Sequence, residues 1–213
     1  MSRPELYQYV VIEGNIGSGK TTLAHKLAEK WGTRLMLEEF KDNPFLPKFY
    51  QNPEQHAFAL ELSFLAERYH QKRDELNRTD LFRPGIVCDY SFGKSLVFAR
   101  INLNEDEFEL YQNLFQIILG RLPKPDILLF LYCSPEKSLR QIKKRGRSYE
   151  QEITIDYLEQ INQGYLEFFR QQTGIRIIIL NTDELDFVES TDDFTKIVSM
   201  LEAQHEPGIT VIP

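Results

Sequence analysis

GNIGSGKT, the segment Gly14–Thr21, determines the fold class of this chain. It fits the pattern G-x-x-x-x-G-K-[ST], in which the backbone amides of a glycine-rich loop bind phosphate oxygens. An apolar, β-branched run at 9–12 precedes the loop and is typical of a buried strand, and apolar residues at helical spacing follow it at 22–28. Because strand, loop and helix come in this order, the loop amides and the helix N-terminus face one anionic ligand. We therefore expect a nucleoside triphosphate at this loop.

Two side chains of the loop have expected roles of their own. Lys20 is expected to reach the outer phosphates, and Thr21 is expected to hold Mg²⁺ through its hydroxyl group. The expected ATP-binding residues are Gly14, Asn15, Ile16, Gly17, Ser18, Gly19, Lys20, Thr21 and Thr22.

The composition favours a globular protein that acts on a small molecule. Of the 213 residues, 42% are hydrophobic and 27% are charged, and the formal net charge of −7 argues against binding to a nucleic-acid backbone. No apolar run approaches the roughly 18 residues of a membrane span, and the first residues show no signal-peptide core. Cys88 and Cys133 lie in apolar, strand-like runs, so we expect buried, reduced thiols and a cytoplasmic protein.

Short apolar runs alternate with longer helical patterns, which is typical of a parallel sheet with helices on both faces. Strands are expected at Tyr7–Ile12, Arg34–Leu37, Ile86–Cys88, Ile127–Tyr132 and Arg176–Leu180. Helices are expected near Thr21–Trp31, Pro53–Asn77, Phe92–Arg100, Glu105–Leu119, Pro135–Arg145, Thr154–Gln172 and Asp192–Ala203, with Thr154 and Asp192 as N-caps. The prediction is an α/β fold of the P-loop NTPase type, with one domain over 1–213, five parallel strands and a loose tail after His205.

Carboxylates follow two strands that are expected beside the loop. Glu38 and Glu39 come after the second predicted strand, and Asp89 comes directly after the third. In open α/β sheets, ligands bind outside the carboxyl ends of the strands. One carboxylate there suits Mg²⁺, and another suits the orientation or deprotonation of an attacking hydroxyl. A solvated loop charge is the alternative for each acid taken alone.

A basic segment ends the helix predicted at Pro135–Arg145. Arg145 and Arg147 flank Gly146, and this arrangement suits a lid over 145–153 that closes on a phosphoryl group. A solvated, basic helix C-terminus gives a similar pattern and is the alternative.

With these features in place, the chain resembles the deoxynucleoside kinase family, of the bacterial deoxyguanosine/deoxyadenosine kinase type. The resemblance extends from Tyr9 to Leu201 and implies transfer of the γ-phosphate of ATP to the 5′-hydroxyl of a deoxynucleoside, in nucleotide salvage. The segments that carry it are Gly14–Thr21, Leu37–Pro44, Phe49–Tyr50, Phe58–Tyr69, Cys88–Ser91 and Arg145–Arg147.

The resemblance also implies roles for single residues. Glu38 matches the general base toward the 5′-hydroxyl, and Asp89 matches the acid that holds Mg²⁺ with Thr21. Tyr50 and Glu150 match the pair that binds the sugar 3′-hydroxyl. The implied catalytic residues are Glu38, Lys20, Arg145 and Arg147, and the implied substrate-binding residues are Glu38, Tyr50, Phe58, Glu61, Arg68, Phe92 and Glu150, with Phe64 as a further candidate for the base pocket. Ordinary core packing is the alternative for the phenylalanines.

Three positions depart from the family pattern. Tyr90 stands where most members have an arginine that steadies the base carboxylate, and Gln141 stands where a further arginine near the lid is common. Glu61 replaces the usual base-reading glutamine, and Arg68 follows it on the same helix.

The glutamate at position 61 bears on which base is bound. An ionised carboxylate only accepts hydrogen bonds, and guanine presents two adjacent donors on its Watson–Crick edge, whereas glutamine suits adenine or cytosine. Arg68 is expected to keep Glu61 ionised and to donate to guanine O6 or N7. Deoxyguanosine is therefore the expected substrate, with deoxyadenosine or deoxycytidine as alternatives. Two charges on one face of an amphipathic helix are the plain alternative for Glu61 and Arg68.

Other functions are compatible with parts of the pattern. A thymidylate-type nucleoside monophosphate kinase shares the loop, a strand-end acid and a basic lid, but needs a cationic site for the phosphate of its acceptor. A P-loop switch protein usually carries an Asn-Lys-x-Asp motif, which this sequence lacks. A regulatory subunit of a heterodimeric kinase is a third alternative. By resemblance we expect a homodimer that packs helices such as Glu105–Leu119, on which Leu110, Leu114, Ile117 and Ile118 form an apolar stripe, with a heterodimer as the alternative.

Overall fold

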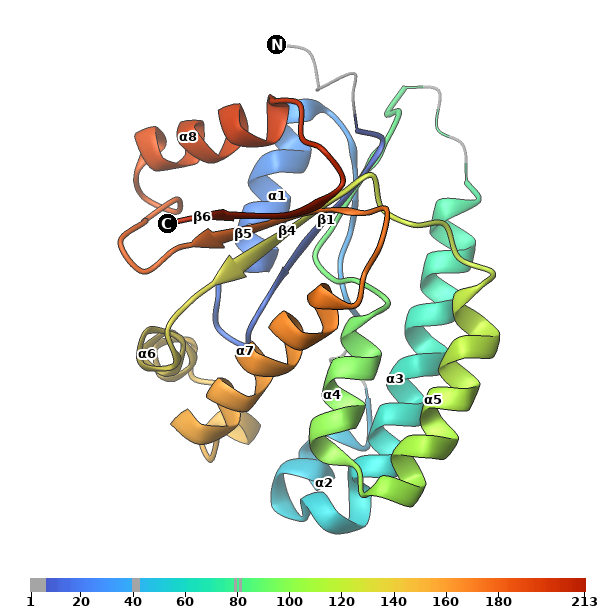
Figure 1. Cartoon of the computed structure of the whole chain (residues 1–213). Coiled ribbons are helices and arrows are strands. Elements are labelled where there is room, and N and C mark those ends of the chain that lie inside the picture. The colour runs from blue at the N-terminus through green and yellow to red at the C-terminus, as the bar shows by residue number, and fades with distance from the viewer. Residues whose placement is uncertain (1–6, 40–42, 79, 81) are drawn as a thin grey trace.

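A computed structural model describes residues 7–39, 43–78, 80 and 82–213 of the chain (Figure 1). Its six strands form one parallel sheet in the order β2-β3-β1-β4-β5-β6. The strands are β1 (Tyr9–Gly14), β2 (Arg34–Met36), β3 (Ile86–Cys88), β4 (Ile127–Tyr132), β5 (Arg176–Asn181) and β6 (Gly208–Ile212). Residues 40–42, part of the stretch that carries the family resemblance, lie outside the described residues.

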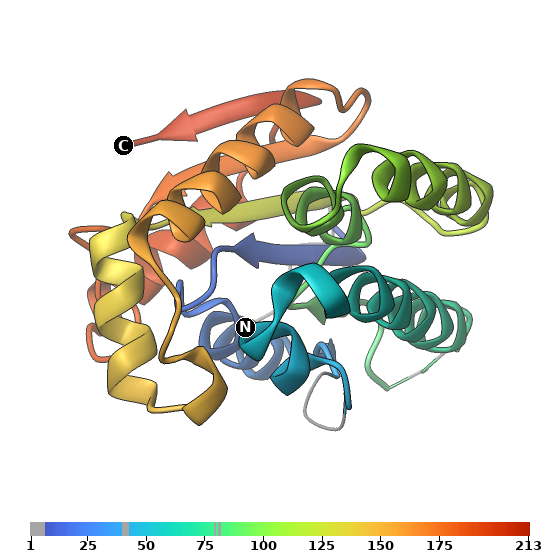
Figure 2. The same ribbon diagram turned by 90° about the horizontal axis from the view of Figure 1, so that it is seen from below.

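Helices cover both faces of the sheet, as the sequence predicts. They are α1 (Lys20–Trp31), α2 (Leu46–Gln51), α3 (Pro53–Leu76), α4 (Lys94–Asn102), α5 (Glu105–Leu119), α6 (Pro135–Arg145), the 3₁₀ turn η1 (Ser148–Glu150), α7 (Ile155–Arg170) and α8 (Thr191–Glu202). Because side chains alternate along a strand, Val10 and Ile12 of β1 pack toward α1 and α8, and Tyr9 and Val11 pack toward α4 and α7. On that second face α3, α4 and α5 lie side by side (Figure 2).

The C-terminal end of the chain corrects the expectation of five strands and a loose tail after His205. β6 pairs in parallel with β5, from Arg176 opposite Gly208 to Leu180 opposite Ile212. Ile209 and Val211 are 42% and 68% exposed, so the backbone ladder to β5 holds this edge strand more than burial does. The four β-branched residues at 209–212 favour a strand, although they bury little surface.

Local sequence signals account for most helix ends. The Thr154 hydroxyl accepts a hydrogen bond from the backbone N–H of Tyr157 and caps α7, as predicted. The predicted cap at Asp192 is wrong, because Ser190 caps α8 and accepts from the backbone N–H of Asp193. The short α2 is not expected from the sequence.

The strand register brings the expected site residues to one edge of the sheet. Val11 of β1 and Met36 of β2 both lie opposite Cys88 of β3. The segments that leave these three strands are therefore neighbours, and they contain the glycine-rich loop, Glu38 and Asp89. This is the carboxyl edge at which open α/β sheets bind ligands.

Candidate active site

The glycine-rich loop connects β1 to α1 in a conformation that needs its glycines. Gly17 and Gly19 have φ values of 83° and 85°, in the left-handed region that side chains disfavour. A Cβ atom at Gly17 would also lie 2.7 Å from the carbonyl oxygen of Ser138 in α6. Glycine at position 17 therefore serves both the turn and the close approach of α6.

Asn15 holds the loop against α7. Its Nδ2 donates to the carbonyl oxygen of Leu158 at 2.7 Å and to Oδ1 of Asn162 at 2.8 Å, while its own Oδ1 accepts from the backbone N–H of Ile16. Asn15 is fully buried and Asn162 is 1% exposed. The shape of the loop thus depends on a helix more than 140 residues further along the chain, at Leu158 and Asn162.

Lys20 lies at the inner end of the loop. Its Nζ donates to the carbonyl oxygen of Asn15 at 3.1 Å. Burial, and then repulsion from Lys94, lower the pKa of Lys20 to about 8. Negative charge beside Lys20 stabilises its protonated form, so the site favours an anionic group.

Asp89, at the end of β3, connects the glycine-rich loop to the segment after β2. Its Oδ2 accepts from the Thr21 hydroxyl at 2.6 Å, and its Oδ1 accepts from the backbone N–H of Glu38 at 2.7 Å. The hydroxyl of Thr21 and the carboxylate of Asp89 are the hard oxygen ligands that Mg²⁺ prefers. The pair therefore fits the magnesium site expected at Thr21 and Asp89.

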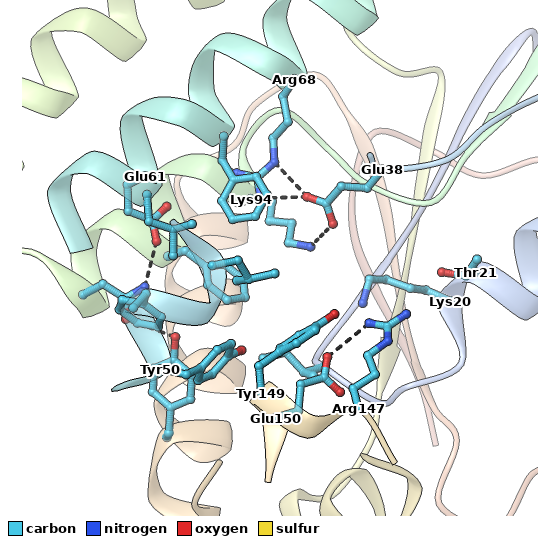
Figure 3. A pocket seen from close by; sticks show the side chains of 18 of the residues that line it. Lys20, Thr21, Glu38, Tyr50, Glu61, Arg68, Lys94, Arg147, Tyr149 and Glu150 are labelled. Atoms are coloured by element: carbon cyan, nitrogen blue, oxygen red, sulfur yellow. Dashed lines mark hydrogen bonds and ion pairs between the residues drawn. The ribbon is translucent and has the colours of Figure 1, made fainter. Parts of the chain in front are cut away.

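Glu38 is held by two cations from two different helices (Figure 3). Arg68 of α3 places Nε and Nη2 at 2.8 and 2.7 Å from Oε1, and Lys94 of α4 places Nζ at 2.6 Å from Oε2. Burial alone would raise the pKa of Glu38, but Lys94, Arg68 and Lys20 together hold it well below its usual range. Glu38 is therefore an oriented carboxylate that stays ionised at any physiological pH.

The basic segment after α6 lies over the same cavity. Arg145 Nη2 is 2.6 Å from Oε2 of Glu150, and Arg147 Nη1 is 3.1 Å from Oε1 of the same carboxylate. Glu150 is 4% exposed, whereas the arginine side chains are about one-third exposed, at 36% and 30%. Both predicted lid arginines are thus present at the site, paired with the residue expected to bind the sugar.

One elongated pocket joins these groups. In Figure 3, Lys20 and Thr21 lie at one end of it, Glu61 lies at the other, and Glu38 with Lys94 lies between them. Tyr50 and Glu150 face it from the opposite wall, where the Tyr50 ring stacks on Tyr149 with centroids 6.0 Å apart. The predicted residues that line it are Ile16, Lys20, Thr21, Glu38, Tyr50, Glu61, Phe64, Arg68, Asp89, Arg145, Arg147 and Glu150.

Two predicted pocket residues are placed elsewhere. Phe92 packs in the core, where its ring stacks on Phe115 at 5.0 Å between centroids. Phe58, also on α3, does not line the pocket described here. Of the three phenylalanines expected at the pocket, Phe64 lines it and Phe58 and Phe92 do not. The other aromatic residues that line it are Phe49, Tyr50, Phe98, Tyr149 and Tyr157.

Glu61 lies on α3 at the end of the pocket away from the glycine-rich loop. Its Oε1 accepts from Nδ2 of Asn102 at 2.8 Å, and its Oε2 is buried without a hydrogen-bond partner among the described residues. Burial raises the pKa of Glu61 to about 7, against the opposing effects of Arg68 and Asn102. Arg68 does favour the ionised form of Glu61, as expected, but burial outweighs its effect on the pKa. The guanidinium group of Arg68 donates its hydrogen bonds to Glu38 and to the Ser95 hydroxyl.

Tyr90, which stands where most of the family has an arginine, does not line the pocket. Its hydroxyl donates to Oε1 of Gln71 at 2.5 Å, and its ring lies 4.0 Å from Nζ of Lys72. Tyr90 is fully buried. Position 90 therefore contributes packing beneath the site and no charge to it.

Three pocket residues on α4 and one on α7 are not predicted from the sequence. Lys94, Phe98 and Asn102 follow one another at a spacing of four and face the pocket from α4, and Tyr157 of α7 donates to Oδ1 of Asn102 at 3.0 Å. The spacing itself was an available signal, since i, i+4 and i+8 share a helix face. The sequence alone does not predict that Lys94, in the first turn of α4, pairs with the buried Glu38.

Two further expectations concern the rest of the chain. Cys88 and Cys133 are both buried free thiols, as predicted. In the parts of the chain that the structure describes, no helix is both long and apolar enough to cross a membrane.

The parallel sheet, the glycine-rich loop and a pocket bounded by a strand-end acid and a basic lid define a P-loop nucleotide-binding protein. Residues 10–205 match the deoxynucleoside kinase family. Deoxyguanosine kinase of Bacillus subtilis (strain 168) is 34% identical over 195 residues, which cover 90% of this chain and 94% of that protein. Deoxyadenosine kinase of Dictyostelium discoideum is 31% identical, over 93% of this chain and 79% of that protein.

A solved structure has the same fold. Deoxyadenosine kinase from M. mycoides with bound dATP superposes with a TM-score of 0.79 at 24% identity, over 92% of this chain and 100% of that one. The chain belongs to the deoxynucleoside kinase family, and it is accordingly a phosphotransferase with an alcohol group as acceptor.

Proposed function

We propose that this protein transfers the γ-phosphate of ATP to the 5′-hydroxyl of a deoxynucleoside, with deoxyguanosine as the preferred substrate. The observation that carries the proposal is the single pocket that contains Lys20 and Thr21 at one end, Glu38 in the middle and Glu61 at the other. A triphosphate at the glycine-rich loop and a nucleoside base at Glu61 leave the 5′-hydroxyl beside Glu38.

In the proposed reaction the 5′-oxygen of the deoxynucleoside attacks the γ-phosphorus of ATP. A lone pair of the 5′-oxygen forms the new bond to the γ-phosphorus, and the bond from the γ-phosphorus to the β,γ-bridging oxygen breaks, which releases ADP. The 5′-hydroxyl proton passes to Glu38. Mg²⁺, held by Thr21 and Asp89, supplies neutralisation of phosphate charge, and Lys20 binds the outer phosphate oxygens.

The ion pairs between the lid arginines and Glu150 can give way to contacts with the phosphates of ATP. Arg145 and Arg147 are about one-third exposed and pair with Glu150 at the wall of the pocket. Phosphate oxygens compete for such arginines, because guanidinium groups bind phosphate through two parallel hydrogen bonds. We infer that the arginines turn to the phosphates when ATP binds, which leaves Glu150, with Tyr50, to accept and donate to the sugar 3′-hydroxyl.

Deoxyguanosine follows from the unpaired oxygen of Glu61. Asn102 occupies Oε1, and Oε2 is buried at 2% residue exposure with no partner among the described residues. Guanine N1–H and its amino group are adjacent donors, which an ionised carboxylate accepts together. A base that offers an acceptor at this point leaves the carboxylate without a hydrogen-bond donor. The site therefore binds such a base much more weakly, which makes it selective.

Deoxyadenosine is the second candidate, and deoxycytidine the third. Relatives with similar coverage of this chain include a Bacillus subtilis deoxyadenosine/deoxycytidine kinase at 27% identity, besides the deoxyguanosine and deoxyadenosine kinases given above. Protonation of Glu61, whose pKa burial raises to about 7, turns Oε2 into a donor that suits adenine N1 or cytosine N3.

A homodimer that works in deoxynucleotide salvage in the cytoplasm completes the proposal. Leu110 and Ile117 of α5 are 52% and 65% exposed on the stripe expected to pack against a second copy. Sedimentation of the wild type and of Ile117→Glu tests this part, because a charge on a buried dimer face should give monomers. An unchanged sedimentation coefficient would remove α5 from the interface.

The experiment that tests the function measures phosphate transfer from ATP–Mg²⁺ to each of the four deoxynucleosides, with the four deoxynucleoside monophosphates as parallel acceptors. Turnover on deoxyguanosine well above the others supports the whole proposal. Turnover on a different deoxynucleoside keeps the reaction and removes the specificity argument. Transfer to monophosphates alone would favour the thymidylate-type reaction, and transfer to no acceptor would favour a regulatory subunit.

A further inference from the structure

Lys94 is a charged residue of the pocket for which the family resemblance assigns no role. It is the first residue of α4, and its side chain is 10% exposed. Its Nζ lies 2.6 Å from Oε2 of Glu38, and this carboxylate is the acceptor of that ammonium group among the described residues. Figure 3 shows the lysine pointing across the pocket toward Glu38, on the side that also faces Lys20.

Glu38 is held at its carboxylate by two cations and at its backbone by Asp89. Arg68 of α3 donates to Oε1, Lys94 of α4 donates to Oε2, and Asp89 accepts from the Glu38 backbone N–H at 2.7 Å. Each carboxylate oxygen thus has its own cation. Removal of Lys94 leaves Oε2 without its partner, so that the carboxylate is able to rotate about the bond to its γ-carbon while Arg68 still holds Oε1.

Stability is a poor explanation for this second cation. Buried ion pairs contribute little to stability, because desolvation offsets most of the Coulombic attraction, and Arg68 alone already neutralises Glu38. With Glu38 ionised, the group of Arg68, Lys94 and Glu38 carries one net positive charge, and Lys94 also lies near enough to lower the pKa of Lys20. A surplus of positive charge at this point suits the entry of the γ-phosphoryl group.

We propose that Lys94 is a positioning residue that holds Glu38 in the orientation needed to accept the 5′-hydroxyl proton. This inference rests on the proposed phosphate transfer and adds to it a residue on α4. Position 90, at the end of β3, supplies no cation here because the Tyr90 side chain is directed to Gln71. The charge that completes the site comes from the next helix instead.

The test compares Lys94→Met with Lys94→Arg, each by single-turnover transfer from ATP–Mg²⁺ to deoxyguanosine. Lys94→Met should lower the transfer rate by about tenfold or more, with the dissociation constant of deoxyguanosine changed less than about threefold. Lys94→Arg should recover most of the rate, because it restores a cation at Glu38. Lys196→Met removes an exposed lysine on α8 and serves as the matched control that keeps wild-type transfer.

Two readouts separate positioning from a structural role. The recovery of the transfer rate in Lys94→Arg shows that a cation at Glu38 is needed, because arginine restores the charge and not the shape of lysine. In the Glu38→Gln background, Lys94→Met should cause no further loss, since its effect acts through the carboxylate.

The outcomes are distinguishable from a failure of the proposed function. A wild type that transfers phosphate to no deoxynucleoside overturns the function itself. A wild type that transfers, combined with Lys94→Met at wild-type rate, overturns the role of Lys94 alone. Equal losses in Lys94→Met and Lys94→Arg, or a further loss beyond Glu38→Gln, also contradict it.

Discussion

Asn102 donates a hydrogen bond to one oxygen of the buried Glu61 carboxylate at 2.8 Å, and the other oxygen is buried without a hydrogen-bond partner among the described residues. Tyr157 in turn donates to Oδ1 of Asn102, so that three elements, α3, α4 and α7, fix the direction in which Glu61 presents its unpaired oxygen. The expected base specificity of the protein depends on the protonation state of that oxygen.

The preference between guanine and adenine should therefore depend on pH. Burial raises the pKa of Glu61 to about 7, while Arg68, Lys94 and the Asn102 hydrogen bond oppose the shift and Glu38 adds to it. Above this pH the carboxylate accepts from guanine, and below it Oε2 carries a proton that suits adenine N1. The ratio of kcat/KM for deoxyguanosine to that for deoxyadenosine should rise by up to about a hundredfold between about pH 6 and 8, because the ionised fraction rises about tenfold while the protonated fraction falls about tenfold. A flat ratio would contradict this.

Glu61→Gln should change which deoxynucleoside is preferred. The amide keeps the shape of the side chain but adds two donors, so it suits adenine or cytosine and opposes the guanine donors. We expect the preference to move toward deoxyadenosine or deoxycytidine by about tenfold or more, and to lose its pH dependence. Competition assays with equal concentrations of the four deoxynucleosides measure it, and an unchanged ranking would exclude Glu61 as the base reader.

Glu61 should also lower stability as pH rises. Its folded pKa lies above the usual 4.5, so between about pH 4.5 and 7 the folded chain holds a proton that the unfolded chain has released. The free energy of unfolding that this proton contributes is fully present below that window and is lost as pH rises through 7, by up to ~3 kcal/mol. Urea unfolding at pH 5 and 8 should show wild type losing stability relative to Glu61→Gln; a constant difference between the two would rule out the raised pKa.

Much of the fold, and the end of the pocket that contains the glycine-rich loop, can be predicted from the amino-acid sequence. A short motif identifies the glycine-rich loop. Glu38 and Asp89 follow neighbouring parallel strands, whose carboxyl ends lie at the same edge of the sheet as the loop, so their place in the site is predictable. β6 is not predictable in the same way, since Ile209 and Val211 lie exposed on an edge strand held by its backbone ladder.

The nucleoside end depends on contacts between residues that are distant in the sequence. Phe58 and Phe92 are aromatic at helical spacing, but the exact rotation of each helix decides which aromatic residue faces the pocket, and that follows from packing. Lys94 meets Glu38, and Asn102 meets Glu61, only because α4 lies against α3. Local patterns carry no information on such pairs.

Asn162→Ala should weaken ATP binding without direct contact to the nucleotide. Asn162 accepts from Asn15 at 2.8 Å and donates to the carbonyl oxygen of Cys133 at 3.1 Å, so its loss removes one of the two hydrogen bonds by which α7 holds Asn15. We expect KM for ATP to rise about tenfold while KM for the deoxynucleoside changes little. Gln163→Ala, on an exposed face of the same helix, is the matched control. An unchanged KM for ATP in Asn162→Ala would mean that the loop keeps its shape without Asn162.

The role of Glu38 as the proton acceptor is the central claim, and Glu38→Gln tests it most directly. A single-turnover experiment with γ-labelled ATP–Mg²⁺ and deoxyguanosine follows the label into the 5′-monophosphate, while calorimetry measures deoxyguanosine binding on the same sample. We expect transfer to fall by about a hundredfold or more, with the dissociation constant changed only a few-fold. Transfer at a rate near that of the wild type, with binding intact, would contradict the assignment of Glu38.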